Sequence, residues 1–367
     1  MHSKTHGRHR AHDDARLAAV PVRGISSPSH SAFARLLTVG TPFFVSKMRW
    51  RAAGALGGIV ALLLTLNTLN VANSYVGRNF ITAISERNAE RYLKFSLLYF
   101  AVFAASTVVG VVCQFVQDRL ALLWRDWLTG HFIDRYLTGQ MFDWINTKRA
   151  IDNPDQRIAE DVRTFTSTLL SFVVMMVNAV LTTLAFAGVL WSIAPKLLLT
   201  AILYATLGSL VTVALGYRLV SLNNLQLKKE ACLRHGLIHL REHLEPLDAR
   251  GQPSGQRVRS LLRRVIRNSR AMIGVNRNLG FFTSGYNYLV PIIPILIVAP
   301  RYLQGNIEFG MVTQSAMAFA QLLGAFSLIV AQFSSISSFA AVVRRLGSLW
   351  EEMESAGGGA ARVRAGG

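Results

Sequence analysis

Charge is missing from this sequence in six long blocks. Each block contains no Asp, Glu, Lys or Arg, and the shortest is 21 residues long. A helix that spans a bilayer needs ~20 consecutive apolar residues, and a soluble domain would need a very large core to bury six such segments. We therefore predict an all-α integral membrane fold with six transmembrane helices. They are expected within residues 52–77, 95–117, 164–195, 197–217, 278–300 and 309–343.

The residues on either side of this six-helix domain, 52–343, fall into three predicted segments. Residues 1–32 are rich in His, Arg and Ser and contain no signal-peptide core, so we predict a disordered cytoplasmic tail. Residues 33–51 mix apolar with basic side chains, as an interfacial elbow helix does. Residues 344–367 are expected to form a cytoplasmic helix and a Gly/Ala-rich tail. The two cysteines are too few for a disulfide framework.

Positive charge is distributed unevenly between the loops. If both termini are cytoplasmic, 33 of the 39 Lys and Arg residues lie on the inner side. The positive-inside rule then fixes the orientation, and the anionic inner leaflet accounts for the net charge of +19 without nucleic acid as a partner. The densest basic run, Arg257 to Arg270, lies between two predicted spans and is interpreted in the same way. We predict a multi-pass protein of the plasma (inner) membrane.

A polar segment before the third span predicts a helix start. Asn153 suits the N-cap position, and Pro154 suits the first helical position. Asp155 complements the positive end of the helix dipole. The cytoplasmic part of the third span is therefore expected to begin here.

The next residues of this segment predict local side-chain contacts. Gln156 stands where a capping-box side chain reaches back to the N-cap. Arg157 and Asp161 have the i,i+4 spacing of a helical ion pair, and Glu160 lies between them. Helix capping alone could explain these residues, so the local pattern leaves a functional role open.

The whole segment resembles a known sequence. Asn-Pro-Asp-Gln-Arg-Ile-Ala-Glu-Asp is similar to the opening of the third span in ABC transporter transmembrane domains. The subgroup is that of the peroxisomal fatty-acyl exporters and the bacterial SbmA/BacA-like transporters. The resemblance covers residues 40–350, and further matching positions are Arg125, Trp127, Glu230, Ala231, Arg234, Arg241, Glu242, Phe282 to Tyr286 and Pro300 to Gly305.

The resemblance implies a working assembly and a mechanism. Two such chains would pack as a homodimer, or a heterodimer with a similar half, and would alternate between inward and outward openings. Cytoplasmic extensions would dock on ATPase domains through coupling helices around 143–152 and 243–252. The second long cytoplasmic loop, residues 218–277, carries the candidate residues Glu230, Arg234, Arg241, Glu242 and Glu245.

The energy source leaves two hypotheses open. The sequence has no G-x-x-x-x-G-K-[ST] loop to hold ATP and magnesium, so we expect no enzymatic activity and no cofactor in this chain. The first hypothesis is a permease half whose ATP and magnesium are bound by a separate ATP-binding subunit. The second is an ATPase-free, proton-driven carrier of the SbmA/BacA type. No Asp, Glu or His lies in the six uncharged blocks, and this favours the first hypothesis.

Polar residues inside the spans are candidates for the solute pathway. Polar groups in a bilayer are costly unless they face a cavity or another helix, so pathway lining and interhelical hydrogen bonding are both possible. On the sixth span, three glutamines are spaced so that an ideal helix places them on one stripe. The candidates are Asn67, Asn70, Ser74, Thr283, Asn287, Tyr288, Gln314, Gln321 and Gln332. Neutral walls would suit a peptide-, cobalamin- or acyl-like solute.

Metal binding and membrane-embedded catalysis are disfavoured. His235, His239 and His243 repeat at helical spacing, but a hydrated helix face explains them better than a zinc site, and we predict no metal. The spans offer no paired carboxylates and no Ser/His arrangement. A permease without catalytic residues is the function that the sequence favours.

Overall fold

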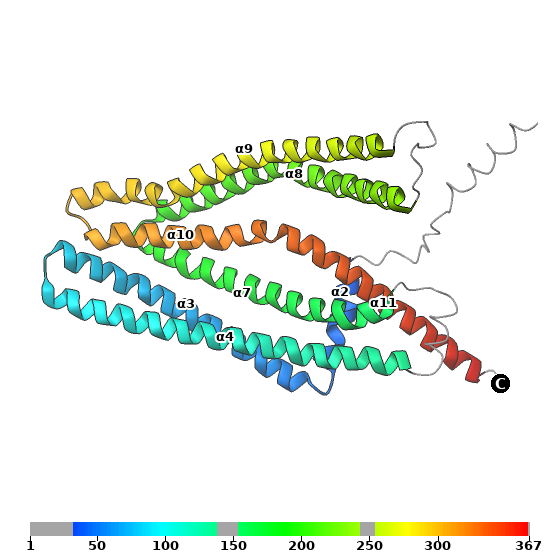
Figure 1. Cartoon of the computed structure of the whole chain (residues 1–367). Helices are drawn as coiled ribbons and strands as arrows, with labels where there is room; N and C mark the ends of the chain where they lie inside the picture. Colours follow the sequence, from blue (N-terminus) through cyan, green and yellow to red (C-terminus); the bar gives the residue numbers. More distant parts are fainter. Residues whose placement is uncertain (1–31, 138–152, 243–253, 366–367) are drawn as a thin grey trace, which may run out of the picture.

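The protein is entirely helical in the part that the computed structural model describes, residues 32–137, 153–242 and 254–365 (Figure 1). Six helices are long and apolar enough to cross a membrane, which confirms the predicted fold class. The elements are α2 (Ala32–Val45), α3 (Arg49–Ser85), α4 (Ala89–Leu137), α6 (Pro154–Gln156), the π-helical η1 (Arg157–Asp161), α7 (Val162–Ile193), α8 (Pro195–Glu242), α9 (Ser254–Leu303), α10 (Phe309–Ala331) and α11 (Phe333–Ala365).

The two ends of the helical bundle differ. At one end, here called the turn end, short turns join α3 to α4, α7 to α8 and α9 to α10 (Figure 1). At the other, here called the basic end, lie the start of α7, the free ends of α8 and α9, and the carboxyl end of α11. The predicted coupling helices at 143–152 and 243–252 fall outside the described residues. So do residues 1–31 of the predicted tail 1–32, whereas Ala32 is the first residue of α2.

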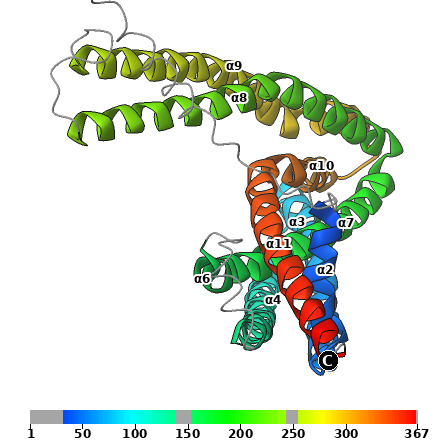
Figure 2. The ribbon, with the colours of Figure 1, turned by 90° about the vertical axis from the view of Figure 1, so that its right-hand side faces the viewer.

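Two apolar clusters hold the helices together. The first lies towards the basic end and joins α2, α3, α4, α7 and α11, with Phe43 stacked on Trp124 at 5.5 Å between ring centroids. The second lies towards the turn end and joins α7, α8, α9 and α10 around Leu197 and Phe319. Because only the second cluster includes α8 and α9, this pair diverges from the other helices towards the basic end (Figure 2).

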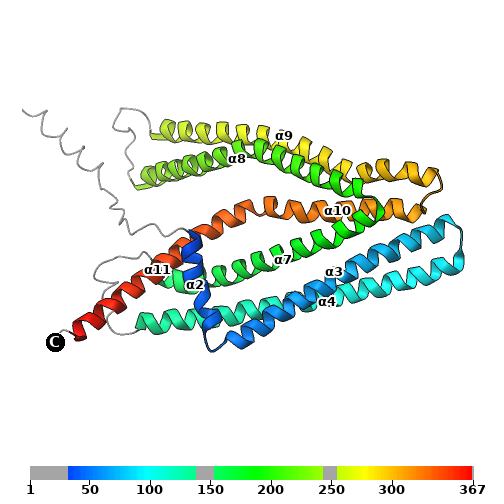
Figure 3. The same ribbon diagram turned by 180° about the vertical axis from the view of Figure 1, so that it is seen from behind.

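The elbow region is shorter than predicted. Helix α2 ends at Val45, and residues 49–51, which we assigned to the same elbow, form the first turn of α3. Val39 and Phe43 are buried, so α2 packs against the bundle as it crosses the basic end from α11 to α3 and α4 (Figure 3).

The sixth span is interrupted, contrary to the continuous helix predicted over 309–343. Gln332 stands in a turn between α10 and α11, and the Ile336 amide donates a hydrogen bond to its carbonyl at 2.9 Å. Helix α11 then continues to Ala365, through the segment expected to be a Gly/Ala-rich tail.

A close helix contact fixes the turn end. Gly310, in the first turn of α10, lies against the Arg78 carbonyl of α3 with no room for a Cβ atom. Its amide donates to Thr82 Oγ1 at 3.2 Å, and Thr82 in turn donates to the Glu308 carboxylate at 3.3 Å. The chain therefore needs glycine at this position for α10 to reach α3.

Candidate functional site

The start of the third span has the predicted position but different contacts. Asn153 occupies the N-cap and Pro154 the first helical position, as predicted. Asn153 is left-handed, with φ of 49°, and its side chain makes no capping hydrogen bond. Gln156 does not reach back to the N-cap but donates to Glu160 at 3.2 Å. The helix then passes through the π-helical turn η1, a geometry that often marks functional positions.

Asp161, at the end of η1, forms a two-pronged ion pair with Arg345 of α11. Its carboxylate oxygens accept hydrogen bonds of 2.6 and 2.7 Å from the Arg345 guanidinium. The Asp161 side chain is only 7% exposed, whereas that of Arg345 is 47% exposed. Hydrogen bonding to Asp161 raises the pKa of Arg345 above its ordinary value.

Arg157 adds a second link between the same helices. Its guanidinium donates to the Arg345 carbonyl at 3.0 Å and to Ser348 Oγ at 2.9 Å. We predicted Arg157 as the partner of Asp161 at i,i+4 spacing. The main contact of Asp161 is instead Arg345, 184 residues away. We call Arg157, Asp161, Arg345 and Ser348 the α7–α11 latch.

Helix α11 is also held from its other side. Arg35 of α2 donates to both carboxylate oxygens of Glu351, at 2.9 and 3.1 Å. Gly347 leaves the space that the aliphatic part of Arg35 occupies. Through this contact and the α7–α11 latch, α11 joins α2 to the beginning of the third span.

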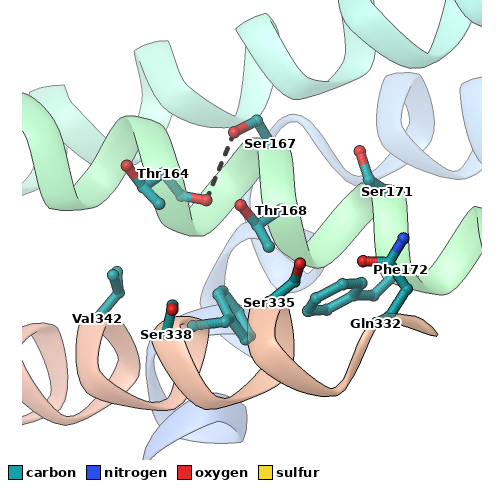
Figure 4. A pocket seen from close by; sticks show the side chains of 10 residues that line it. Thr164, Ser167, Thr168, Ser171, Phe172, Gln332, Ser335, Ser338 and Val342 are labelled. Carbon is teal, nitrogen blue, oxygen red and sulfur yellow. Dashed lines mark hydrogen bonds between the residues drawn. The ribbon is translucent and has the colours of Figure 1, made fainter. Parts of the chain in front are cut away.

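A cavity of about 490 Å³ separates α7 from the first turns of α11 (Figure 4). Its lining is rich in hydroxyl groups and contains no charged residue, so we call it the hydroxyl cavity. The lining residues are Thr164, Ser167, Thr168, Ser171, Phe172, Gln332, Ser335, Ser338, Phe339 and Val342. Gln332, one of the predicted pathway residues, is among them. Only the amide of Gln332 was predicted; the serines and threonines gave no signal that set them apart from ordinary helix residues.

The other polar residues of the first and sixth spans have different environments. Asn67 bonds Asn178 at 3.1 Å and Thr182 at 2.9 Å, and Ser74 accepts a bond of 3.2 Å from Gln314. These contacts join helices. Asn70 is half-buried, and Gln321 is exposed. The three glutamines of the predicted stripe have different environments: Gln314 is buried, Gln321 is exposed, and Gln332 lies in the turn between α10 and α11, so their shared role in a pathway stays a prediction.

The fifth span contributes to a second cavity. Thr283 and Asn287 line a space of about 230 Å³ between α8, α9 and α10, together with Ser209 and Thr212. Tyr288 is 77% exposed and does not line it. Of these polar residues, Thr283 and Asn287 were predicted from the sequence, whereas Ser209 and Thr212 of α8 were not.

Tyr204 and Tyr286 fasten α8 to α9 beside that cavity. Their rings stack at 4.3 Å between centroids. Tyr204 donates to the Tyr286 carbonyl at 2.8 Å, and Tyr286 donates to the Tyr204 carbonyl at 3.4 Å. Gly208 makes the close approach possible, because a Cβ atom there would overlap the Tyr286 ring.

The candidate residues of the second cytoplasmic loop that the structure describes lie on α8, towards its end at Glu242. Glu230 accepts a hydrogen bond of 2.9 Å from Gln226, while Arg234 and Arg241 are exposed. Glu242 is the last residue of α8, and Glu245 falls outside the described residues. Their predicted role in docking stays a prediction.

A buried amide pair joins the α8 and α9 extensions, and it was not predicted from the sequence. Asn268 donates to Gln226 at 2.8 Å and to the Leu222 carbonyl at 3.0 Å. Both amides are at least nine-tenths buried. This contact holds the two extensions in register. His235 and His239 lie nearby on α8, and within the described residues no three potential metal ligands gather.

The outer face of the α9 extension carries uncompensated positive charge. Helix α9 contains eight arginines and no acidic residue. Arg259, Arg263, Arg267 and Arg270 are exposed and fall within about 80° of one another on an ideal helix. We call these four the arginine stripe.

The extension of α4 carries acidic residues on the opposite side of the molecule. Asp118, Asp126 and Asp134 are all exposed, and the exposed Leu122 and Ile133 lie among them. Figures 1 and 2 show α4 and α9 at opposite faces, so these residues do not meet the arginine stripe of the same chain.

Comparison with known proteins identifies the fold. The family described as ABC transporter transmembrane region 2 matches residues 41–303, which contain α3 to α9. The chain belongs to this family. The match includes the predicted motif at 153–161 and ends before α10.

Curated relatives cover most of this chain. "ABC transporter D family member 2, chloroplastic" of Arabidopsis thaliana is 39% identical over 84% of this chain and 44% of its own length. An uncharacterized ABC transporter ATP-binding protein of Synechocystis is 34% identical over 90% of this chain and 51% of its own. The human protein named "Lysosomal cobalamin transporter ABCD4" is 23% identical over 83% and 52%. The chain thus spans about half the length of these relatives.

Proposed function

We propose that this chain forms the transmembrane half of an ABC-type transporter that moves a peptide-, cobalamin- or acyl-like solute by alternating access. The observation that carries the proposal is the uncharged, hydroxyl-lined cavity between α7 and α11, in a fold of this family. Polar side chains inside a membrane domain face a cavity or another helix and not lipid. The hydroxyl cavity is therefore suited to be part of the solute pathway.

An ATP-binding unit is the energy source that we favour. Two of the relatives described above are about twice as long as this chain, and one is named an ATP-binding protein. No Asp, Glu or His lies in the six uncharged blocks, and the two cavities described above have uncharged linings. A proton-driven carrier of the SbmA/BacA type would need titratable groups that reach both sides of the membrane.

We place the basic end in the cytoplasm. Residues 218–277, which include the α8 and α9 extensions, carry 13 Lys and Arg residues, more than any other loop, and the positive-inside rule assigns such loops to the cytoplasmic side. A plasma-membrane location stays a prediction, since the relatives described above include a chloroplastic and a lysosomal protein.

A second copy is the partner that fits the arginine stripe. Counted from the ends of the uncharged blocks at ~1.5 Å per residue, Asp126 and Arg270 lie about 13 and 12 Å beyond the membrane. Asp134 and Arg263 lie about 25 and 22 Å beyond it. The exposed aspartates of α4, which alternate with Arg119, Arg125 and Arg135, and the arginine stripe of α9 thus lie at matching distances from the membrane, and a second chain could bring them together.

Disulfide cross-linking tests this pairing. In a chain carrying Cys113→Ala and Cys232→Ser, we expect Asp126→Cys with Arg270→Cys to form a disulfide-linked dimer under mild oxidation. The matched control is Asp126→Cys with Arg257→Cys, because Arg257 lies about 18 Å farther from the membrane than Asp126. We expect at least tenfold less dimer from the control pair on a non-reducing gel. Equal yields, or no dimer from either pair, would contradict the proposed pairing.

Transport by the purified chain in proteoliposomes tests the energy source. Uptake of labelled cobalamin, a labelled peptide and a labelled acyl compound is measured first under an imposed proton gradient. We expect no uptake until an ATP-binding unit of a close relative and ATP are added. Gradient-driven uptake that an uncoupler abolishes would establish the proton-driven carrier and overturn the ATP-driven one.

A further inference from the structure

The hydroxyl cavity contains hydrogen-bonding groups that the protein itself does not use. Within the described residues, the side chains of Thr164, Thr168, Gln332 and Ser335 have no hydrogen-bond partner. Ser167 is occupied by the Arg163 carbonyl at 2.9 Å, and Ser171 accepts from Gln117 at 3.1 Å. The unused groups come from both walls, so a molecule between α7 and α11 could bond to both at once (Figure 4).

The chemistry of the lining distinguishes between classes of ligand. Hydroxyl and amide groups both donate and accept, so they match neutral amide and hydroxyl groups of a ligand. A carboxylate or ammonium placed among them would lose hydration without meeting an opposite charge, because no lining residue is ionisable. No basic residue is among the lining residues, and Arg345, three residues beyond Val342, is paired with Asp161.

Part of the lining, contributed by both α7 and α11, is apolar. Phe172 and Phe339 meet edge to face, at 5.6 Å between ring centroids, and Val342 also lines the cavity. An apolar or aromatic group of a ligand can pack on these side chains while its polar groups reach the hydroxyls. The volume of about 490 Å³ falls within the ~300–1,000 Å³ common for small-molecule sites.

We propose that the hydroxyl cavity binds an uncharged, amide- or hydroxyl-bearing part of the solute together with an adjoining apolar group, and that it discriminates against a charged group at this position. The inference rests on the proposed function for the identity of the ligand as transported solute. A charge elsewhere on the solute would have to lie outside this cavity. The site thus narrows the solute by the chemistry of one of its parts.

Protection of an introduced cysteine tests the inference without transport or ATP. Ser335→Cys places a thiol at the exposed edge of the cavity, and native Cys232, which is exposed on α8, is an internal control in the same sample. Alkylation of both by N-ethylmaleimide is followed by peptide mass spectrometry. The probes are N-acetylalanylphenylalaninamide and the matching free acid, which differ by one charge. We expect the amide to slow alkylation at position 335 at a concentration at least tenfold lower than the acid, with no effect at Cys232.

Removing the unused hydroxyls provides a second variant. Thr164→Val with Thr168→Val keeps the side-chain shape and breaks no hydrogen bond of these side chains within the described residues. We expect the half-protecting concentration of the amide to rise on the order of tenfold, as two lost hydrogen bonds require. Thr107→Val is the matched control, because Thr107 lies on α4 outside the cavity and bonds only its own helix, at Phe103.

Several results would overturn the inference. They are equal protection by amide and acid, no protection by either probe, equal slowing at Cys232, and protection that survives loss of both threonine hydroxyls. None of them depends on the energy source. A failure of ATP-driven uptake with intact amide protection would instead count against the proposed function alone.

Discussion

Replacing Arg345 with glutamine will destabilise the protein more than replacing Asp161 with asparagine. In Arg345→Gln the Asp161 carboxylate, only 7% exposed, loses its counter-charge and both charged hydrogen bonds. Removing one partner of a fully buried pair costs ~3–5 kcal/mol. Because Arg345 is 47% exposed, water can replace part of the interaction, and we expect a cost of about 2 kcal/mol.

The asymmetry between the two single variants is the diagnostic result. Asp161→Asn leaves a guanidinium that solvent can reach, so its cost should be the smaller one. Both midpoints are measured by thermal unfolding in detergent. The double variant Asp161→Asn with Arg345→Gln should recover part of the loss, because neither residue then carries an unpaired charge. A double variant whose loss equals the sum of the two singles would show that the pair contributes no coupling.

Transport activity of the variants should decrease in the same order as their stability. Loosening the α7–α11 latch frees the start of the third span from α11, so we expect Arg345→Gln to reduce transport at least tenfold while membrane insertion is retained. Arg345→Lys keeps the positive charge but cannot donate to both Asp161 carboxylate oxygens as the planar guanidinium does. We expect its transport activity to lie between those of the unmodified protein and Arg345→Gln. Normal transport by Arg345→Gln at normal expression would show that the latch has no role in the cycle.

Gly310→Ala should disrupt the turn end, although it adds a single methyl group. The new Cβ atom would overlap the Arg78 backbone carbonyl and Thr82 Oγ1, and a backbone atom cannot rotate away. Helices α3 and α10 must therefore separate, which weakens the Gly310 to Thr82 hydrogen bond. Such overpacking costs ~1–3 kcal/mol, occasionally more.

Gly324→Ala is the matched control on the same helix. A Cβ atom at Gly324 meets no atom within 4 Å, and alanine favours helix by roughly 0.5–1 kcal/mol. We expect unchanged or slightly higher stability for this variant, and a lower unfolding midpoint with less monodisperse protein for Gly310→Ala. Equal behaviour of the two in size-exclusion chromatography and thermal unfolding would contradict the close contact described here.

The spans and the helix start could be predicted because their signals are local. Loss of charge over twenty residues identifies a span wherever its neighbours lie, and the Asn153-Pro154 pair marks a helix start by backbone geometry alone. The partner of Asp161 could not be predicted in this way. Arg345 lies 184 residues away, and the single sequence offered Arg157 as a nearer alternative.

The candidate pathway was only partly predictable for a related reason. Ideal helix geometry placed three glutamines on one stripe, but the helix is interrupted at Gln332, and α11 runs in a different direction from α10 (Figure 1). Whether a membrane amide joins two helices or faces a cavity depends on the neighbouring helix, as the contrast between Asn67 and Gln332 shows. The serines and threonines of the hydroxyl cavity became a group only when α7 and α11 were brought together.

The break at Gln332 makes α11 a lever. Arg345 is 13 residues from the break, a lever arm of about 20 Å at ~1.5 Å per residue. A swing of about 10° about Gln332 would move Arg345 by about 3.5 Å and carry Asp161 and Arg35 with it through their ion pairs. The hydroxyl cavity lies between this lever and α7, near the pivot. A small displacement of α11 near Gln332 would therefore accompany a larger displacement of Arg345 at the basic end. A force applied to α11 at the basic end would act on the cavity with a larger magnitude.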